Sequence, residues 1–351
     1  MAAIASNSVD LVVTSPPYPM IEMWDNSFAM QNPTIDAAIA KGQGQLAYEM
    51  MHALLDQVWH EVARVLKPGA IACINIGDAT RKLGTTFSLY PNHSRIIQSF
   101  LSLGMHNLPN IIWRKPTNAP NKFMGSGMLP TGAYVTLEHE WILLFRKQGK
   151  RPFDEEQERL ARHENAYFWE ERNHWFSDVW QLKGTIQKLS DPEVRQRSAA
   201  FPYEIPFRLI LMYSLRGDVV LDPFAGTATT ALAALATGRN SIGYELENEL
   251  LDTIDGAFTQ QQVPILNERT LRRLFEHTTF IRNRRNTDKT RVKHYNHHLQ
   301  YPVMTVQETK LKMFLVHLLK KQQVGRYTGT YHQITSVEDA LIQYDRSPIL
   351  S

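Results

Sequence analysis

The chain alternates short apolar runs of strand length with longer amphipathic segments of helix length, and this alternation restricts its fold more than any other feature. The strand-like runs are rich in Val, Ile and Leu, and Pro or Gly residues follow several of them. Such alternation is typical of an α/β sheet with helices on both faces. We therefore predict this architecture for most of the chain.

Two segments set the pattern in the amino-terminal half. Val9–Thr14 is a β-branched run that must end at Ser15, because Pro16 and Pro17 can neither continue a strand ladder nor enter a helix interior. Residues 46–66 carry apolar side chains at helical spacing and end in Lys-Pro-Gly, which predicts an amphipathic helix. We expect further strands at residues 70–76, 110–113, 140–145, 218–221 and 241–244, and further helices at residues 93–103, 203–215 and 229–237.

Composition narrows the class of protein. Hydrophobic residues make up 43% and charged residues 21% of the 351 residues, which is the balance of an ordinary globular protein. The sequence contains neither the run of about 18 apolar residues that a membrane helix needs nor a secretory leader, so we expect a cytoplasmic protein that binds no membrane. Cys73 is the only cysteine, which excludes disulfides and cysteine-based zinc sites.

The net charge of +3 is the sum of two unlike parts. Residues 265–351 contain 15 Lys and Arg against 7 Asp and Glu, whereas residues 1–264 contain 23 against 28. A basic region attached to a mildly acidic body suggests an anionic partner, for which nucleic acid is the usual candidate. Three histidines in this region, His294, His297 and His298, suit phosphate contacts better than a metal, because no carboxylate or cysteine is spaced to complete a metal site. A solvated basic face is the alternative interpretation.

The first motif that carries chemistry is Thr14-Ser15-Pro16-Pro17-Tyr18, at the end of an apolar strand, where open α/β sheets bind ligands. Methylation of an exocyclic amine requires hydrogen-bond acceptors for the NH2 group and a fixed line of attack on the methyl donor. The Ser15 hydroxyl and the Pro16 carbonyl can accept those bonds, and Tyr18 offers an aromatic face to a base swung out of a duplex. Taken alone, the motif fits a proline-rich turn equally well.

The second motif follows the apolar run Val219-Val220-Leu221 and has the sequence DPFAGTATT over residues 222–230. Gly226 permits a tight turn, and the amino terminus of the following helix offers free N–H groups to a ligand carboxylate. Asp222 can hold a ligand ammonium, and Glu245 ends the next predicted strand, where an acidic side chain grips ribose hydroxyls in nucleotide-binding folds. Without G-x-G-x-x-G or a Walker Gly-Lys-Ser/Thr, a nicotinamide, flavin or nucleoside triphosphate is disfavoured. An ordinary strand–turn–helix is the alternative.

Together the two motifs resemble those of the S-adenosylmethionine-dependent amino-methyltransferases of DNA, with a target motif S/N/D-P-P-Y/F and a cofactor motif D-P-F-x-G-x-G-T-T. The target motif precedes the cofactor motif by some 200 residues, an order similar to the circularly permuted beta class. The resemblance covers the chain to about residue 255. It includes RVLKPG at residues 64–69, WRKP at 113–116, HE at 139–140, RK at 146–147, SDVW at 177–180 and FPYEIP at 201–206.

The resemblance implies a Rossmann-like class I methyltransferase sheet in permuted order, S-adenosylmethionine as cofactor and double-stranded DNA as partner. It also implies a restriction–modification role, in which a cognate endonuclease acts separately. The target base would be held by Ser15, Pro16, Pro17 and Tyr18. The cofactor would be held by Asp222, Pro223, Phe224, Gly226, Thr227, Thr229, Thr230, Glu245 and Asp178. No metal is expected.

The identity of residue 15 bears on the base that is methylated. A serine there is typical of family members that methylate N4 of cytosine, whereas aspartate or asparagine is typical of N6-adenine enzymes. Methylation at C5 of cytosine needs a cysteine nucleophile, and Cys73 lies inside an apolar run where a packing role is expected. We therefore predict N4 of cytosine, with N6 of adenine as the alternative.

The same resemblance divides the chain into four parts. We predict a catalytic half at residues 1–148, a target-recognition insertion at 149–200, a cofactor-binding half at 201–262 and a basic extension that contacts DNA at 263–351. Two departures from the family pattern stand out. Ala228 replaces the usual glycine of the cofactor loop, at an expected small cost. The usual Gly-Asp-type segment before the target motif is either absent from the protein or lost to a late start of this sequence.

Three rival functions are compatible with these observations. A non-catalytic DNA-binding protein could retain a methyltransferase scaffold, and the missing upstream segment favours it. An enzyme with the same two motifs could also methylate an RNA base or a protein amide. The intact TSPPY and DPF motifs argue against the first rival, and the basic region argues against the others. Asp78, after the predicted strand at 70–76, could line the same cleft as Asp178, although strand-end aspartates often form turns.

Overall fold

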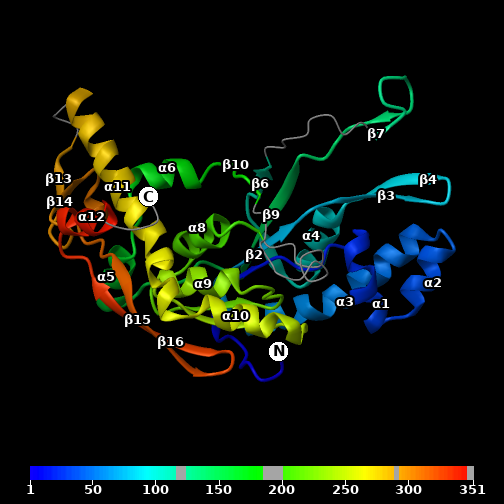
Figure 1. The fold of residues 1–351 in the computed structure, drawn as a ribbon, viewed down its shortest axis with the longest axis horizontal. Helices are drawn as coiled ribbons and strands as arrows, with labels where there is room; N and C mark the ends of the chain where they lie inside the picture. The colour runs from blue at the N-terminus through cyan, green and yellow to red at the C-terminus, as the bar shows by residue number, and fades with distance from the viewer. Residues whose placement is uncertain (116–123, 185–200, 288–291, 346–351) are drawn as a thin grey trace.

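The computed structural model describes residues 1–115, 124–184, 201–287 and 292–345 (Figure 1). A central eight-stranded sheet has the order β10-β6-β9-β2-β1-β11-β12, and β5 pairs with the end of β9. The strands are β1 (Val9–Thr14), β2 (Leu66–Ile76), β5 (Met105–Asn107), β6 (Ile111–Arg114), β9 (His139–Lys147), β10 (Val179–Gln181), β11 (Val219–Asp222) and β12 (Asn240–Gly243).

One strand of this sheet runs against the others. β9 is antiparallel to β2, β5 and β6, whereas β1 is parallel to β2 and β11, β11 to β12, and β6 to β10. The parallel strands therefore end at one edge of the sheet, which we call the carboxyl edge, and β9 begins there. In open α/β sheets this edge is where ligands bind.

Helices cover both faces of the sheet. Side chains of β1 alternate between the faces: Val12 joins a core that includes Trp59 and Phe100 of α3 (Gly44–Val65) and α4 (Asn92–Ser102). Leu11 and Val13 join a second core with α8 (Glu204–Tyr213) and α9 (Thr229–Ala236). The predicted α/β architecture is therefore present, with each predicted strand and helix named above found within a few residues of its expected bounds.

The remaining elements lie outside this three-layer core. They are α1 (Asp25–Gln31), α2 (Thr34–Ala40), α5 (Glu156–Glu164), α6 (Trp169–Trp175), α10 (Leu251–Ala257), α11 (Val263–Thr287), α12 (Val337–Asp345), and the hairpins β3 (Ala79–Leu83)–β4 (Thr86–Tyr90), β7 (Met124–Gly125)–β8 (Ala133–Tyr134), β13 (His294–Asn296)–β14 (Tyr301–Val303) and β15 (Phe314–Gln323)–β16 (Arg326–Gln333). The described helices include none that is long and apolar enough to cross a membrane.

Two local differences from the sequence prediction have simple causes. β2 begins at Leu66 rather than residue 70, because the segment through Pro68 forms an irregularity opposite β1, where a proline without an N–H is tolerated. The long segment before β9, expected to be a loop, contains the β7–β8 hairpin in its described part. Cys73 is buried in the sheet, and burial raises the pKa of its thiol, so the expected packing role fits its surroundings.

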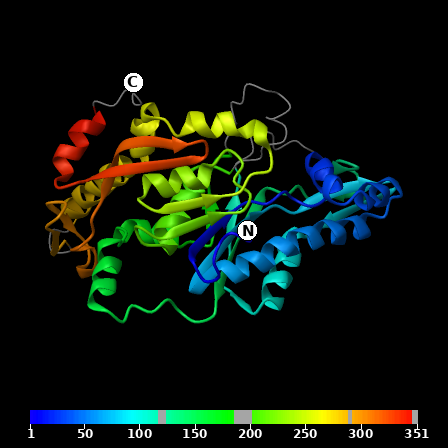
Figure 2. The ribbon, with the colours of Figure 1, turned by 90° about the horizontal axis from the view of Figure 1, so that it is seen from below.

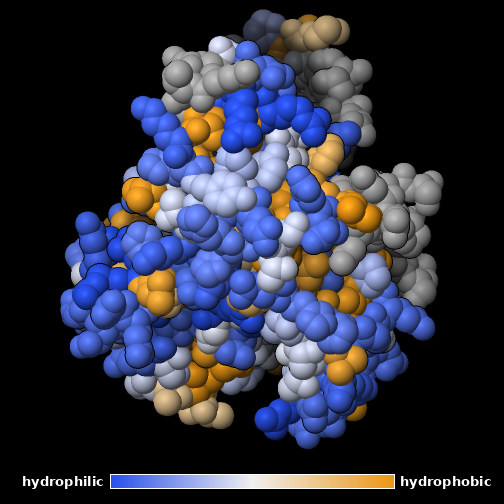
Figure 3. Space-filling model, turned by 90° about the vertical axis from the view of Figure 1, so that its left-hand side faces the viewer, coloured by the Kyte–Doolittle hydropathy of each residue, from blue (hydrophilic) through white to orange (hydrophobic). Residues whose placement is uncertain are grey.

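The carboxyl-terminal region is folded rather than loose. α11, α12 and two hairpins lie at one end of the molecule, with the β3–β4 hairpin, α1 and α2 at the other end (Figures 1 and 2). The described part of residues 149–200 packs into it: Phe168, beside α6, stacks on His277 of α11 with ring centroids 3.8 Å apart. The outer surface of this end is mostly hydrophilic, with small separated apolar patches (Figure 3).

Part of the positive charge of this region pairs with acidic residues of the body. Arg273 pairs with Glu171 at 2.5 Å and Arg269 with Glu204 at 2.7 Å, and both arginines are buried. Lys312–Glu164 and Lys321–Asp255 form two further pairs with acidic residues that precede residue 263. The positive charge of residues 263–351 therefore partly neutralises the acidic body to which it is attached, which its total charge did not indicate.

Candidate active site

The two predicted motifs meet at the carboxyl edge. β1 and β11 are adjacent and parallel, with Val12 opposite Leu221, so the residues that follow each strand lie side by side. The Thr14 hydroxyl donates a hydrogen bond of 2.5 Å to Oδ1 of Asp222, and both side chains are buried. This bond joins two segments that are 208 residues apart in the sequence.

Asp222 is a buried carboxylate, and no cationic side chain of the described residues forms an ion pair with it. Burial raises its pKa from 3.8 to about 6, although hydrogen bonds from Thr14 and from the Phe224 amide, the latter 3.1 Å from Oδ1, favour the ionised form. A ligand ammonium placed beside this carboxylate would remove the cost of burying its charge. The position therefore suits the cation-binding role that the sequence predicts.

The loop after Asp222 is held by Glu245. The Gly226 amide donates to Oε2 of Glu245 at 2.6 Å, and the amides of Leu246 and Glu247 donate to its Oε1 at 2.8 and 2.9 Å. Gly226 has φ of +52°, which a glycine adopts without strain. The carboxylate thus lies directly beside the loop, at the end of β12, as predicted.

Ala228 also has a left-handed backbone, with φ of +61°. A residue with a Cβ loses about 1–2 kcal/mol in this conformation. The substitution of the usual glycine therefore costs more than the sequence suggested.

Other predicted cofactor residues fall into two groups. Thr227 and Thr229 are half-buried in the loop, with their hydroxyl oxygens 3.5 Å apart. Pro223 and Thr230 are buried, and the Thr230 hydroxyl donates to the Val13 carbonyl at 3.3 Å, which fastens α9 to β1. Phe224 packs edge-on against Trp59 of α3. Thr230 and Phe224 therefore anchor the two ends of the loop to β1 and α3.

The target motif carries a polar network. Tyr18 donates from its hydroxyl to Oε2 of Glu140 at 2.8 Å, and the Ser15 and Tyr18 oxygens are 3.1 Å apart. Asn75 donates from Nδ2 to the Tyr18 oxygen at 2.7 Å and to Oε2 of Glu140 at 2.8 Å, and the same nitrogen lies 3.4 Å from the Ser15 oxygen. We call Ser15, Tyr18, Asn75 and Glu140 the target-motif network.

Two neighbouring residues, Lys115 and Gly77, contribute to this network: one pairs with its carboxylate and the other leaves room for its side chains. Lys115, at the end of β6, forms an ion pair with Oε1 of Glu140, and its ammonium lies 4.4 Å from the Trp113 ring centroid. Gly77, after β2, has no side chain where the Tyr18 ring and the Glu140 stem come close. Burial and the nearby Glu140 carboxylate raise the Tyr18 pKa well above 10.0, so the hydroxyl keeps its proton.

A second layer of polar residues holds the turn after Tyr18. Asn92, at the start of α4, donates from Nδ2 to the Pro19 carbonyl at 3.0 Å and to the Gly77 carbonyl at 2.9 Å. Its Oδ1 lies 3.0 Å from Nε2 of His52, whose pKa burial lowers to about 4, so that this histidine is neutral and donates. Asp78 pairs with His93 at 2.7 Å, which occupies its carboxylate.

Asp178 lies apart from the other predicted cofactor residues. It precedes β10, and four strands, β6, β9, β2 and β1, lie between β10 and β11. At about 4.8 Å per strand this is a separation of roughly 24 Å from Asp222. Its side chain is exposed, and its backbone carbonyl accepts a bond from Ile112. The family resemblance implies a cofactor contact for Asp178. Four strands lie between its position and the cofactor motif, and the assignment stays a prediction.

Three residues of the site were not singled out in the sequence: Asn75, Lys115 and Glu140. Lys115 and Glu140 belong to the WRKP and HE segments that carry the family resemblance, but those segments gave no role. Their position in the sequence could have indicated a role, since each lies where a predicted strand meets the carboxyl edge. Asn75 is the one polar residue of an otherwise apolar run and is 3% exposed.

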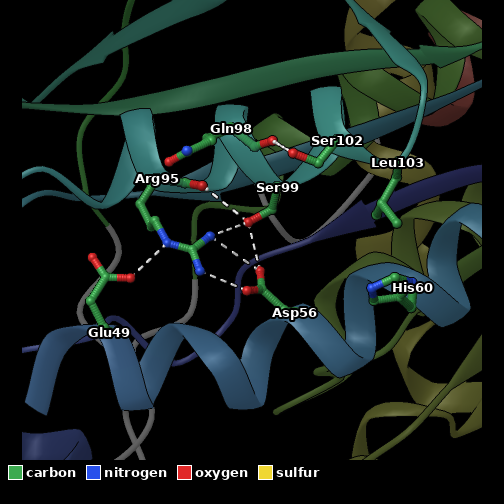
Figure 4. Close-up of a pocket in the computed structure, with 8 residues that line it drawn as sticks. All are labelled: Glu49, Asp56, His60, Arg95, Gln98, Ser99, Ser102 and Leu103. Atoms are coloured by element: carbon green, nitrogen blue, oxygen red, sulfur yellow. Dashed lines mark hydrogen bonds and ion pairs between the residues drawn. The ribbon is translucent and has the colours of Figure 1, made fainter. Parts of the chain in front are cut away.

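A separate pocket of about 470 Å³ lies between α3 and α4 (Figure 4). Arg95 points into it and pairs with Glu49 at 3.0 Å and with Asp56 at 2.7 Å. The residues that line it include none from the two motifs. Its charges are satisfied among themselves, so we assign it no role in the site.

The sheet has one reversed strand, and the ends of two adjacent strands bring a proline-rich motif next to a buried aspartate and a glycine loop. This arrangement defines a Rossmann-like methyltransferase. Comparison with known proteins agrees. The crystal structure of TTHA0409 from Thermus thermophilus, described as a DNA modification methylase and complexed with S-adenosyl-L-methionine, superposes with a TM-score of 0.55 at 31% identity, over 73% of this chain and 87% of that one. The predicted class of fold is therefore confirmed.

The family is also shown by sequence. Residues 9–255 match the N6_N4_Mtase family, described as DNA methylase. The chain is 48% identical over 336 residues to the Type II methyltransferase M.MthZI of Methanothermobacter thermautotrophicus, covering 95% of this chain and 93% of that protein. It is 50% identical over 266 residues to M.MjaI of Methanocaldococcus jannaschii, covering 73% and 86%. This chain therefore belongs to the N6/N4 DNA methyltransferase family.

Proposed function

We propose that this protein transfers a methyl group from S-adenosylmethionine to the exocyclic N4 amine of cytosine at a specific site in double-stranded DNA. The observation that carries the proposal is the bond between Thr14 and Asp222, which places the target motif beside the cofactor motif. The target motif precedes the cofactor motif in the sequence, as in the permuted beta class. Relatives named Type II methyltransferases support a restriction–modification role, with a cognate endonuclease acting separately.

The residues at the end of β11 fit the chemistry of S-adenosylmethionine. Asp222 would hold the ammonium of its methionyl part, and Glu245 would accept bonds from its ribose hydroxyls. The turn at Gly226 would bring Thr227, Thr229 and the start of α9 close to its carboxylate, which their N–H groups would face. When bound, the cofactor supplies an electrophilic methyl group on a sulfonium.

The target-motif network determines what Ser15 can do. Tyr18 has one hydroxyl hydrogen, and that hydrogen is directed to Glu140 at 2.8 Å. The hydrogen of the 3.1 Å contact between Ser15 and Tyr18 must therefore come from Ser15, whose lone pairs remain available. Ser15 is thus oriented to accept a bond from an amine, together with the Pro16 carbonyl. This is what a flipped cytosine N4 requires.

DNA contacts are assigned to two regions by proposal. Residues 149–200 would read base edges, and residues 263–351 would contact phosphates through their exposed cations. In the described part these exposed cations include Arg282, Arg285, Lys293 and Arg326. Because such contacts release counterions, DNA affinity should fall steeply with salt.

Nucleoside mass spectrometry tests the proposed reaction. Purified protein, S-adenosylmethionine and mixed-sequence duplex DNA should yield N4-methylcytosine. N6-methyladenine in its place would overturn the base assignment alone. Ser15→Ala should lose turnover and retain cofactor binding by calorimetry. Failure of the unaltered protein to bind S-adenosylmethionine would favour a non-catalytic DNA-binding protein.

A further inference from the structure

We propose that Glu140 is the final acceptor of the proton that the target amine loses, and that this proton reaches it through Ser15 and Tyr18. The inference rests on the proposed methylation of an exocyclic amine and adds a role for a residue outside both motifs. It is carried by the hydrogen-bond distances and directions of the target-motif network.

Methyl transfer leaves a proton to be removed. As the N–CH3 bond forms, the S–CH3 bond breaks and its electron pair stays on sulfur, which becomes a neutral thioether. The amine nitrogen then bears a positive charge and must release one hydrogen as a proton. Neither the Ser15 hydroxyl nor the Pro16 carbonyl is basic enough to be the final acceptor of that proton, whereas a carboxylate is.

A continuous chain of hydrogen bonds connects Ser15 to one carboxylate. The Ser15 and Tyr18 oxygens are 3.1 Å apart, and the Tyr18 oxygen is 2.8 Å from Oε2 of Glu140. Ser15 Oγ can take the amine proton while its own proton passes to the Tyr18 oxygen and the Tyr18 proton passes to Glu140. The Ser15 and Tyr18 oxygens each gain one proton as they give one up, so the amine loses its positive charge and Glu140 is the one relay group whose charge changes.

Three side chains surround the Glu140 carboxylate. Lys115 faces it from the end of β6, Tyr18 from the turn after β1, and the uncharged Asn75 from β2. The Lys115 ammonium is the opposite charge that this carboxylate faces. The proton of a methylated, charged arylamine is strongly acidic, so an ion-paired carboxylate is basic enough to accept it.

The other carboxylates near the carboxyl edge are engaged differently. Glu245 accepts bonds from backbone amides of the cofactor loop and of the turn after β12. Asp222 accepts from Thr14 and the Phe224 amide and is assigned to the cofactor ammonium. Asp78 is paired with His93. The side chain of Glu140 is 13% exposed and makes direct contact with Tyr18, so it is the carboxylate that the network serves.

Single-turnover kinetics with excess protein, labelled S-adenosylmethionine and duplex DNA test the relay. Glu140→Gln keeps the shape of the side chain and removes the proton acceptor. Its rate of methyl transfer should fall by about 100-fold, with unchanged affinity for S-adenosylmethionine and DNA. Glu138→Gln is the matched control, because Glu138 lies on the same segment, is 43% exposed and pairs with Arg114. The control should keep the wild-type rate.

Chemical rescue separates proton transfer from a purely positioning role. Added formate should restore a substantial part of the rate of Glu140→Gly and should not change the rate of Glu138→Gly. A Glu140→Gln rate within threefold of wild type, or a slow Glu140→Gly variant that formate does not rescue, would overturn the relay. Wild-type formation of N6-methyladenine would overturn only the proposed base, because the same variant ratios apply to that amine. Absence of any DNA methylation by the wild type would overturn both proposals.

Discussion

Gly77 lies at the point where adding one methyl group would disturb the target-motif network most directly. A Cβ built on Gly77 would lie 2.9 Å from Cε2 and 3.2 Å from Cδ2 of Tyr18, and 3.3 Å from Cγ of Glu140. Carbon atoms in contact prefer about 3.5–4.0 Å, so Gly77→Ala must move the Tyr18 ring by roughly 0.6 Å or more. The 2.7, 2.8 and 3.1 Å bonds of its hydroxyl cannot all survive such a shift.

The size of the expected effect follows from this shift. Overpacking by one methyl group costs about 1–3 kcal/mol of folding stability, which a protein of this size should tolerate. A misplacement approaching 1 Å can cost up to about 100-fold in rate. We therefore expect Gly77→Ala to fold, to transfer methyl groups about 10- to 100-fold more slowly at single turnover, and to bind S-adenosylmethionine normally, because Asp222 and Glu245 lie on other strands.

Gly256→Ala is the matched control for this substitution. Gly256 lies in α10, and a Cβ built there meets no atom within 4 Å. Removing a helical glycine should raise stability by about 0.5–1 kcal/mol and leave the rate unchanged. A Gly77→Ala rate within twofold of wild type would refute the reasoning that the position of Tyr18 limits catalysis. Loss of cofactor binding would show that the clash spreads beyond the target motif.

Three further predictions concern charge. Burial raises the Asp222 pKa from 3.8 to about 6. The folding stability that the protonated Asp222 carboxyl contributes is therefore complete below pH 3.8 and is lost as the pH rises through 6. Asp222→Asn should thus stabilise the cofactor-free protein at pH 8 by about 2–3 kcal/mol in urea unfolding, lose that gain by pH 4, and weaken cofactor binding. Glu171→Gln leaves the buried Arg273 without its carboxylate partner and should lower the free energy of unfolding by about 3–5 kcal/mol. A loss below about 1 kcal/mol would contradict this. Arg282→Ala with Arg285→Ala should reduce the slope of log affinity for DNA against log salt by about 2 without changing thermal stability; an unchanged slope would place the DNA elsewhere.

The sequence predicted those features that depend on local patterns. The run Val9–Thr14 and its proline stop define a strand end whatever the rest of the chain does, because proline removes the donor and fixes the backbone. The apolar run before Asp222 and the following Gly226 define a second strand end in the same way. Since parallel strands end at one edge, two such ends could be expected to meet there.

Contacts across the sheet were beyond such reasoning. Glu140 reaches Tyr18 because β9 is antiparallel and begins at the edge where β1 ends, with β2 between them. Neither the direction of β9 nor its place in the strand order is encoded by a local pattern. The same strand order places four strands between β10, which follows Asp178, and β11, which ends in Asp222, and no local motif encodes that separation.

The charge of the carboxyl-terminal region shows how burial divides residues of one type between two tasks. Arg269 and Arg273 are 8% and 5% exposed and bind glutamates of the body, so their attraction is little screened by salt and serves folding. Arg282 and Arg285, further along the same helix, are exposed, so any attraction they exert on phosphates is screened. Salt should therefore weaken DNA binding at concentrations that leave the attachment of this region intact, and loss of both together would mean that the exposed arginines also hold the fold.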